Sequence, residues 1–108
     1  MEIKEINEFI ESEIKRLEEY YGDKDKNERT MATGFKLVEE VGELFEALLA
    51  KMGYQRKSKL KDVKLKDLDK EFSDVIFTTL ILAKKFNIDI EESIKLKMEE
   101  VKKRQYND

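Results

Sequence analysis

Apolar residues recur at helical spacing along most of the chain, and alternation with a period of two is rare. The first stripe spans residues 3–21 and consists of Ile3, Ile6, Ile10, Ile14, Leu17 and Tyr21. Such a stripe predicts an amphipathic helix that buries one face. Gly22 follows at the position where a left-handed residue commonly ends a helix, and residues 22–29 are expected to form a polar loop.

A second helix is expected to begin between Thr30 and Thr33 and to end before Gly53. One side of it is apolar and carries Leu37, Val41, Leu44, Phe45, Leu48 and Met52. At 100° per residue, Glu39, Glu43 and Glu46 lie on the other side, whereas Glu40 lies at the border of the apolar arc. The pattern therefore predicts a helix with an acidic face and one acid at the edge of its core-facing side.

A third helix is expected from near Asp67 to near Phe86, after a basic connector that covers residues 54–66. Between Phe72 and Ala83 the segment is apolar on almost every side, which predicts a helix enclosed by neighbouring elements.

A fourth helix should follow Asp89, which forms a capping-box pattern with Glu92. Its inner stripe consists of Ile90, Ile94, Met98 and Val101, and it is expected to end near Tyr106. Four helices with short links predict an all-α fold, a four-helix bundle formed by a single domain over residues 1–108.

Composition narrows the function classes. Charged residues make up 44% of the chain but nearly cancel to a net charge of −3, so neither nucleic acid nor a membrane is an expected partner. The absence of His and Cys excludes an imidazole base, a zinc triad, disulfides and a Glu-x-x-His di-iron centre. No segment is apolar enough to span a membrane, and the first ten residues are too polar for a signal peptide, so a cytoplasmic protein is expected.

Two acids interrupt the apolar third helix. Glu71 and Asp74 are three residues apart and share a face, and Glu40 and Glu43 repeat this spacing on the second helix. A buried carboxylate is costly unless a cation, a proton or a basic side chain compensates it. If the two helices pack side by side, the four carboxylates form an all-oxygen site suited to Mg²⁺ or Mn²⁺. A buried salt bridge and an ordinary solvated acidic face are the alternatives at this point.

The same acids carry a resemblance. "EEVGE" at residues 39–43, followed by "EFSD" at residues 71–74, resembles the EExxE…ExxD signature of the MazG-like, all-α nucleotide pyrophosphohydrolases. The resemblance covers residues 36–104. It implies a MazG fold that usually forms a homodimer, or a tetramer if dimers pair. It also implies Mg²⁺-dependent hydrolysis of a nucleoside triphosphate to the monophosphate and pyrophosphate.

The resemblance assigns roles to individual residues. Glu40, Glu43, Glu71 and Asp74 match the metal ligands, and Glu39 matches the leading acid of the motif. Because the chain has no His, Glu39 or Glu43 is the expected holder of the attacking water. Phosphate contacts are expected from Lys36, Lys97 and Arg104, for each of which an ordinary surface cation is the alternative.

The chain also departs from its relatives. Several of them use Trp or His against the base, and this chain has neither residue, so the aromatic surface would come from Phe9, Tyr20, Tyr21, Phe35 or Tyr54. The segment "VIFTTL" after Asp74 lacks the His typical of phosphoribosyl-ATP pyrophosphohydrolase. The expected role is thus hydrolysis of a nucleoside triphosphate, with cleansing of the nucleotide pool as the expected purpose. A non-catalytic helical module that oligomerises or binds a partner is the alternative.

Overall fold

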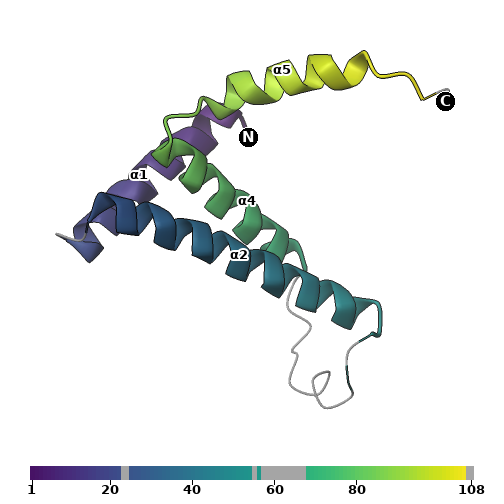
Figure 1. Cartoon of the computed structure of the whole chain (residues 1–108), viewed down its shortest axis with the longest axis horizontal. Helices are drawn as coiled ribbons and strands as arrows, with labels where there is room; N and C mark the ends of the chain where they lie inside the picture. The colour runs from purple at the N-terminus through teal and green to yellow at the C-terminus, as the bar shows by residue number, and fades with distance from the viewer. Residues whose placement is uncertain (23–24, 55, 57–67, 107–108) are drawn as a thin grey trace.

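The computed structural model describes residues 1–22, 25–54, 56 and 68–106, and this part of the chain contains helices and no strand. The helices are α1 (Ile3–Tyr21), α2 (Lys26–Lys51), α4 (Leu68–Lys85) and α5 (Ile90–Lys102), shown in Figure 1. The predicted all-α class with four helices is therefore confirmed. No helix within these ranges is long and apolar enough to cross a membrane.

Most helix ends lie where the sequence places them. Helix α1 has the predicted bounds, and Gly22 ends it with φ +62° while its N–H donates to the Glu18 carbonyl oxygen at 2.9 Å. Asp89 caps α5 as predicted, because its side chain accepts a hydrogen bond from the Glu92 N–H at 3.1 Å. Helix α5 ends at Lys102, however, so the predicted end near Tyr106 is too late.

The start of α2 differs from the prediction. The helix begins at Lys26, within the segment expected to be a polar loop. The cause is Asp25, whose side chain accepts a hydrogen bond from the Asn27 N–H at 2.9 Å and so satisfies one of the free donors of the first turn. The first turn is polar because it is exposed, and a hydrophobic pattern therefore does not reveal it.

The main packing contact joins α2 and α4, which lie side by side in Figure 1. Helix α1 packs on α4, where Ile10 is 3% exposed and the rings of Phe9 and Phe77 lie 5.4 Å apart. The Lys84 ammonium lies 2.9 Å from a carboxylate oxygen of Glu11, and this contact lowers the pKa of Glu11. These contacts hold α1, α2 and α4 in one body.

Helix α5 is weakly attached. Its principal contact is a small one with α4, and it runs away from the other helices in Figure 1. None of its residues is buried. The predicted inner stripe of α5 therefore faces no core within this chain.

Helix α4 is also open on one side. Phe72 is 46% exposed and Ile76 is 55% exposed, so the prediction of a helix enclosed by neighbours is wrong for the single chain. The basic connector predicted over residues 54–66 lies outside the described residues, except for Tyr54 and Arg56. Helices α4 and α5 therefore leave apolar side chains exposed on the single chain.

Candidate metal centre

The contact between α2 and α4 buries two carboxylates. Glu40 on α2 is 7% exposed and Glu71 on α4 is 5% exposed. Among the described residues, the other two that are buried are Ile10 and Leu44. Leu44 lies one turn after Glu40, so the face of α2 that packs on α4 carries both an apolar residue and an acid. The position of Glu40 at the edge of the predicted apolar arc explains its burial.

A third carboxylate joins these two. Glu40, Glu43 and Glu71 each offer an oxygen atom, and the three oxygens lie within 4.8 Å of one another. These three residues are called the acid cluster below. Three carboxylate oxygens this close together would be able to hold one small divalent cation.

The donor set of the acid cluster fits a hard divalent cation. All of its candidate ligand atoms are carboxylate oxygens, which suit Mg²⁺ and Mn²⁺. Glu40 Oε2 is buried and has no hydrogen-bond partner. A buried acceptor without a partner destabilises the folded state, and a cation in the cluster would satisfy it.

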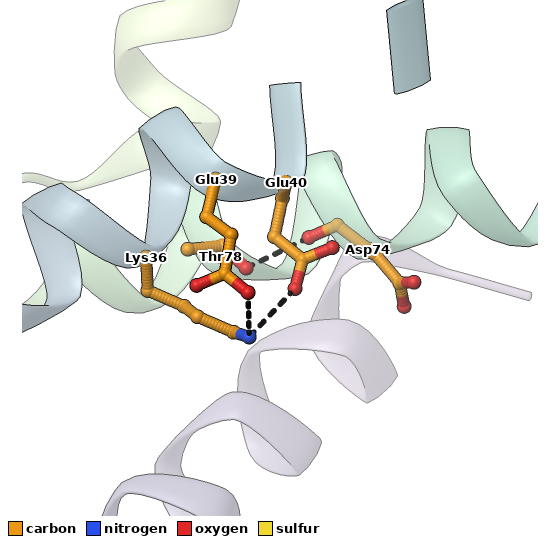
Figure 2. A network of polar contacts seen from close by, with 5 residues as sticks. All are labelled: Lys36, Glu39, Glu40, Asp74 and Thr78. Carbon is orange, nitrogen blue, oxygen red and sulfur yellow. Dashed lines mark hydrogen bonds and ion pairs between the residues drawn. The ribbon is translucent and has the colours of Figure 1, made fainter. Parts of the chain in front are cut away.

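Lys36 reaches the edge of the acid cluster from the preceding turn of α2. Its Nζ lies 3.2 Å from Glu40 Oε1 and 3.4 Å from Glu39 Oε1, as Figure 2 shows. The hydrogen bond to Glu40 is the main cause of a raised pKa of Lys36, although partial burial opposes it. A salt bridge, the alternative to a metal site, is therefore present at Glu40. It involves only Oε1 of this residue and leaves Oε2 without a hydrogen-bond partner.

Sequence reasoning did not predict the pair between Lys36 and Glu40. The signal was present, because residues four apart on a helix are neighbours and a Lys and a Glu at that spacing attract each other.

Asp74 lies outside the acid cluster. Its side chain is exposed, and in Figure 2 the contact drawn at Asp74 is the hydrogen bond from the Thr78 hydroxyl to its backbone oxygen, at 2.8 Å. Three residues along a helix turn by about 300°, which rotates Asp74 by roughly 60° from the direction of Glu71. The structure thus brings together three of the four predicted metal ligands and leaves Asp74 at the rim.

A comparison with known families agrees with this geometry. The model of the MazG nucleotide pyrophosphohydrolase domain matches residues 26–107, a range that contains α2, α4, α5 and the whole acid cluster. The chain belongs to the MazG nucleotide pyrophosphohydrolase family. The resemblance that the sequence motifs suggested is therefore confirmed. Neither a curated protein nor a solved structure matches the chain.

The other predicted site residues of this MazG protein lie farther from the acid cluster. Glu39 is exposed and bonded to Lys36. Lys97 on α5 and Arg104, two residues after the end of this helix, both contact Glu100 of α5, at 3.3 and 4.0 Å. Helix α5 runs away from the contact between α2 and α4 in Figure 1, and the phosphate contacts expected of Lys97 and Arg104 stay a prediction.

Some of the aromatic residues predicted as candidates for base binding in this MazG protein contact another aromatic ring, and the others are exposed. Phe9 packs on Phe77, and Tyr20 and Tyr21 stack edge to face with ring centroids 5.0 Å apart. Phe35 and Tyr54 are exposed. Of these candidates, Phe35 is the one that lies on α2, where it precedes Glu39 by one turn.

Proposed function

We propose that this MazG protein hydrolyses a nucleoside triphosphate to the nucleoside monophosphate and pyrophosphate with the help of Mg²⁺, which Mn²⁺ could replace. One observation carries the proposal: carboxylates from α2 and α4 converge within 4.8 Å, at residues inside the range that the family model matches. The buried and unsatisfied oxygen of Glu40 supports a bound cation at this place.

The residues that would hold the ion are Glu40, Glu43 and Glu71, with Asp74 at the rim as the fourth ligand. When bound, a divalent cation neutralises phosphate oxygens and lowers the pKa of a coordinated water. The packing of α2 on α4 fixes Glu40 and Glu71 in place, because both are buried between these helices.

The proposed reaction is an attack of water on the α-phosphorus. The oxygen of the water forms a bond to phosphorus, the bond from phosphorus to the α,β-bridging oxygen breaks, and pyrophosphate leaves with the bonding electrons. The proton of the water passes to a carboxylate, for which Glu39 and Glu43 are the candidates, since the chain has no His. Lys36 lies beside Glu39 and can place a positive charge near the phosphates.

The test is a screen for pyrophosphate release from canonical and damaged nucleoside triphosphates in the presence of Mg²⁺. The wild-type protein should release pyrophosphate, and Glu43→Gln should reduce kcat/KM by about 100-fold or more, because it removes a ligand charge and a candidate base. Glu99→Gln is the matched control, since Glu99 is an exposed glutamate on α5 that pairs with Lys102. It should retain wild-type activity.

The screen also decides between the two function classes. Release from damaged nucleotides at a higher kcat/KM than from canonical ones would support a role in cleansing the nucleotide pool. If a folded protein releases pyrophosphate from none of the nucleotides, the hydrolase proposal is wrong and the non-catalytic helical module becomes the better description.

We also propose that two chains form a homodimer, because one chain leaves too much surface uncovered. The accessible surface is 9276 Å², whereas a folded monomer of 12.9 kDa is expected to have about 6,300 Å². The radius of gyration is 17.5 Å, whereas a compact chain of this length has about 13 Å. The excess surface, on the order of 3,000 Å², is enough for an obligate dimer, in which each partner buries roughly 1,000–2,500 Å².

The dimer proposal bears on the phosphate-binding residues. Helix α5 carries Lys97 and exposed apolar residues, and Arg104 follows two residues after its end; this combination suits a helix that packs against a second chain. Contact of these cations with a substrate would require α5 to lie near the acid cluster of that second chain.

We further propose a single cytoplasmic domain over residues 1–108, which is supported by the packing of α1 on α4 and by the absence of cysteine.

A further inference from the structure

The position of Lys36 points to a role beyond that of a simple phosphate contact. Its Nζ lies 3.2 Å from Glu40 Oε1, so it neutralises the same carboxylate that offers an oxygen to the acid cluster. We propose that Lys36 is an internal counter-cation of the metal-free site, acting on Glu40. It holds Glu39 and Glu40 while no metal is bound, and it releases Glu40 when a divalent cation arrives. This inference rests on the proposed function, because it assumes that the acid cluster binds a metal.

The charges explain why such a counter-cation is needed. Three carboxylates within 4.8 Å of one another repel each other, and Glu40 is too buried for water to reduce that repulsion. The ammonium of Lys36 offsets part of it through its contact with Glu40. A divalent cation carries twice the charge and would replace Lys36 as the compensating group.

The exposure of the two partners explains why Lys36 can leave. The side chain of Lys36 is 53% exposed, whereas that of Glu40 is 10% exposed. An ammonium that detaches from Glu40 can therefore be hydrated at once, while Glu40 stays in place for the metal. Lys36 also retains a partner, because Glu39 lies on its exposed side at 3.4 Å.

The release changes what Lys36 can contact. In Figure 2 its side chain runs below the carboxylates of Glu39 and Glu40, and its Nζ contacts both of them. Rotation about the side-chain bonds is sufficient to detach it, because all three residues lie on the same helix. After release the ammonium is available to a phosphate of the substrate. Lys36 is thus a positioning residue before it is a substrate contact, and it should weaken the binding of metal in the absence of nucleotide.

The test is a calorimetric titration of the whole protein with Mn²⁺ in the absence of nucleotide. Lys36→Met should bind Mn²⁺ about tenfold more tightly than wild type, because the metal no longer competes with the ammonium. Its metal-free form should melt at a lower temperature than metal-free wild type, whereas the two Mn²⁺-saturated forms should differ less. Lys102→Met is the matched control: Lys102 forms a pair with Glu99 at 3.2 Å on α5, and its loss changes the net charge equally without touching the cluster.

Different results overturn different claims. If wild type binds Mn²⁺ but Lys36→Met binds it equally or less tightly, the counter-cation role is wrong and the metal centre stands. If wild type binds no Mn²⁺, the proposed function fails, and this inference fails with it. Should Lys36→Met unfold without metal, Lys36→Gln in its metal-loaded form is titrated with a chelator. Slower loss of Mn²⁺ to the chelator than from wild type supports the role, and equal or faster loss overturns it.

Discussion

Glu40 and Glu71 are costly residues for a chain with so small a core. Both are more than nine-tenths buried, and ionised carboxylates lose most of their hydration in such places. Lys36 compensates part of the charge of Glu40, but one oxygen of that residue stays without a partner. At the scale of single residues, the protein therefore has the charge arrangement of a site that is completed by a ligand.

The first prediction concerns Glu71. Adding Mg²⁺ at 100 times its dissociation constant should stabilise wild type by about 2.7 kcal/mol, because the metal binds the folded form. Glu71→Gln should lose most of that increment, since it removes one of the converging ligands. Melting curves recorded with Mg²⁺ and with a chelator provide the measurement.

Glu99→Gln, with the same change on the exposed face of α5, should keep the full increment. An undiminished effect of Mg²⁺ on Glu71→Gln would mean that the ion does not bind at the acid cluster.

Sequence reasoning identified the acid cluster but not its details. Glu40 and Glu71 could be predicted because each interrupts or borders an apolar face, which indicates partial burial. Asp74 was predicted to face inward with Glu71, yet it is exposed, because the angle between α2 and α4 decides which acid points to the neighbour. That angle depends on tertiary packing, and the sequence of one helix does not determine it.

At the scale of elements, the packing of α1 on α4 depends mainly on one position. Ile10 is 3% exposed, and the other members of the α1 stripe become more exposed toward both ends of the helix, where Ile3 and Tyr21 lie. The contacts beside it are the ring pair of Phe9 and Phe77 and the ion pair of Glu11 and Lys84. Since both ion-pair partners are about half exposed, the apolar contacts should provide most of the stability here.

The second prediction tests this unequal distribution. Ile10→Ala should lower the free energy of unfolding by about 2–4 kcal/mol, because it leaves a cavity at the contact between α1 and α4. Ile3→Ala is the same chemical change on the same helix, and it should cost less than about 1 kcal/mol because Ile3 is 39% exposed. Urea unfolding followed by circular dichroism measures both. Equal losses would show that α1 is not held through its centre.

The elements themselves were largely predictable, for a local reason. Helices in this chain are marked by amphipathic stripes and by Gly22 and Asp89 at their ends, all of which act within a few residues. The missed start of α2 is the exception, because Asp25 caps a first turn that has no apolar residue facing a core. A search of the sequence for N-cap residues, made independently of the apolar pattern, would have found the start of α2 at Asp25.

At the scale of the whole molecule, the apolar surface of α4 and α5 is the dominant feature. Phe72 and Ile76 on α4 and Ile94, Met98 and Val101 on α5 are exposed, although all are residues expected in a core. Hydropathy predicts that such residues become buried, but it does not distinguish burial within one chain from burial between two chains. That is why the sequence predicted an enclosed α4 and the single chain shows an open one.

The third prediction follows from the proposed dimer. Ile76→Glu places a charge at the centre of the exposed face of α4, where burial against a second chain would leave it without compensation. Wild type should sediment as a dimer at micromolar concentration, and Ile76→Glu should sediment as a monomer or fail to fold. Tyr20→Glu at the far end of α1 is the control, because it also adds a charge at the position of an exposed large hydrophobic residue and should stay dimeric. A wild type that sediments as a monomer would contradict the proposal.

The matched family range begins at Lys26 and so leaves out α1 completely. Yet α1 contributes Ile10, the apolar side chain best shielded among those that the structure describes, and it covers part of α4 with Phe9 and Glu11. A gene fragment designed from family boundaries would therefore encode every acid of the cluster and still expose the flank of α4 around Phe77. Such a fragment should be prone to aggregate when it is expressed, and its loss of activity would say nothing about catalysis. The range that the family model matches is thus shorter than the set of helices that pack together in this protein.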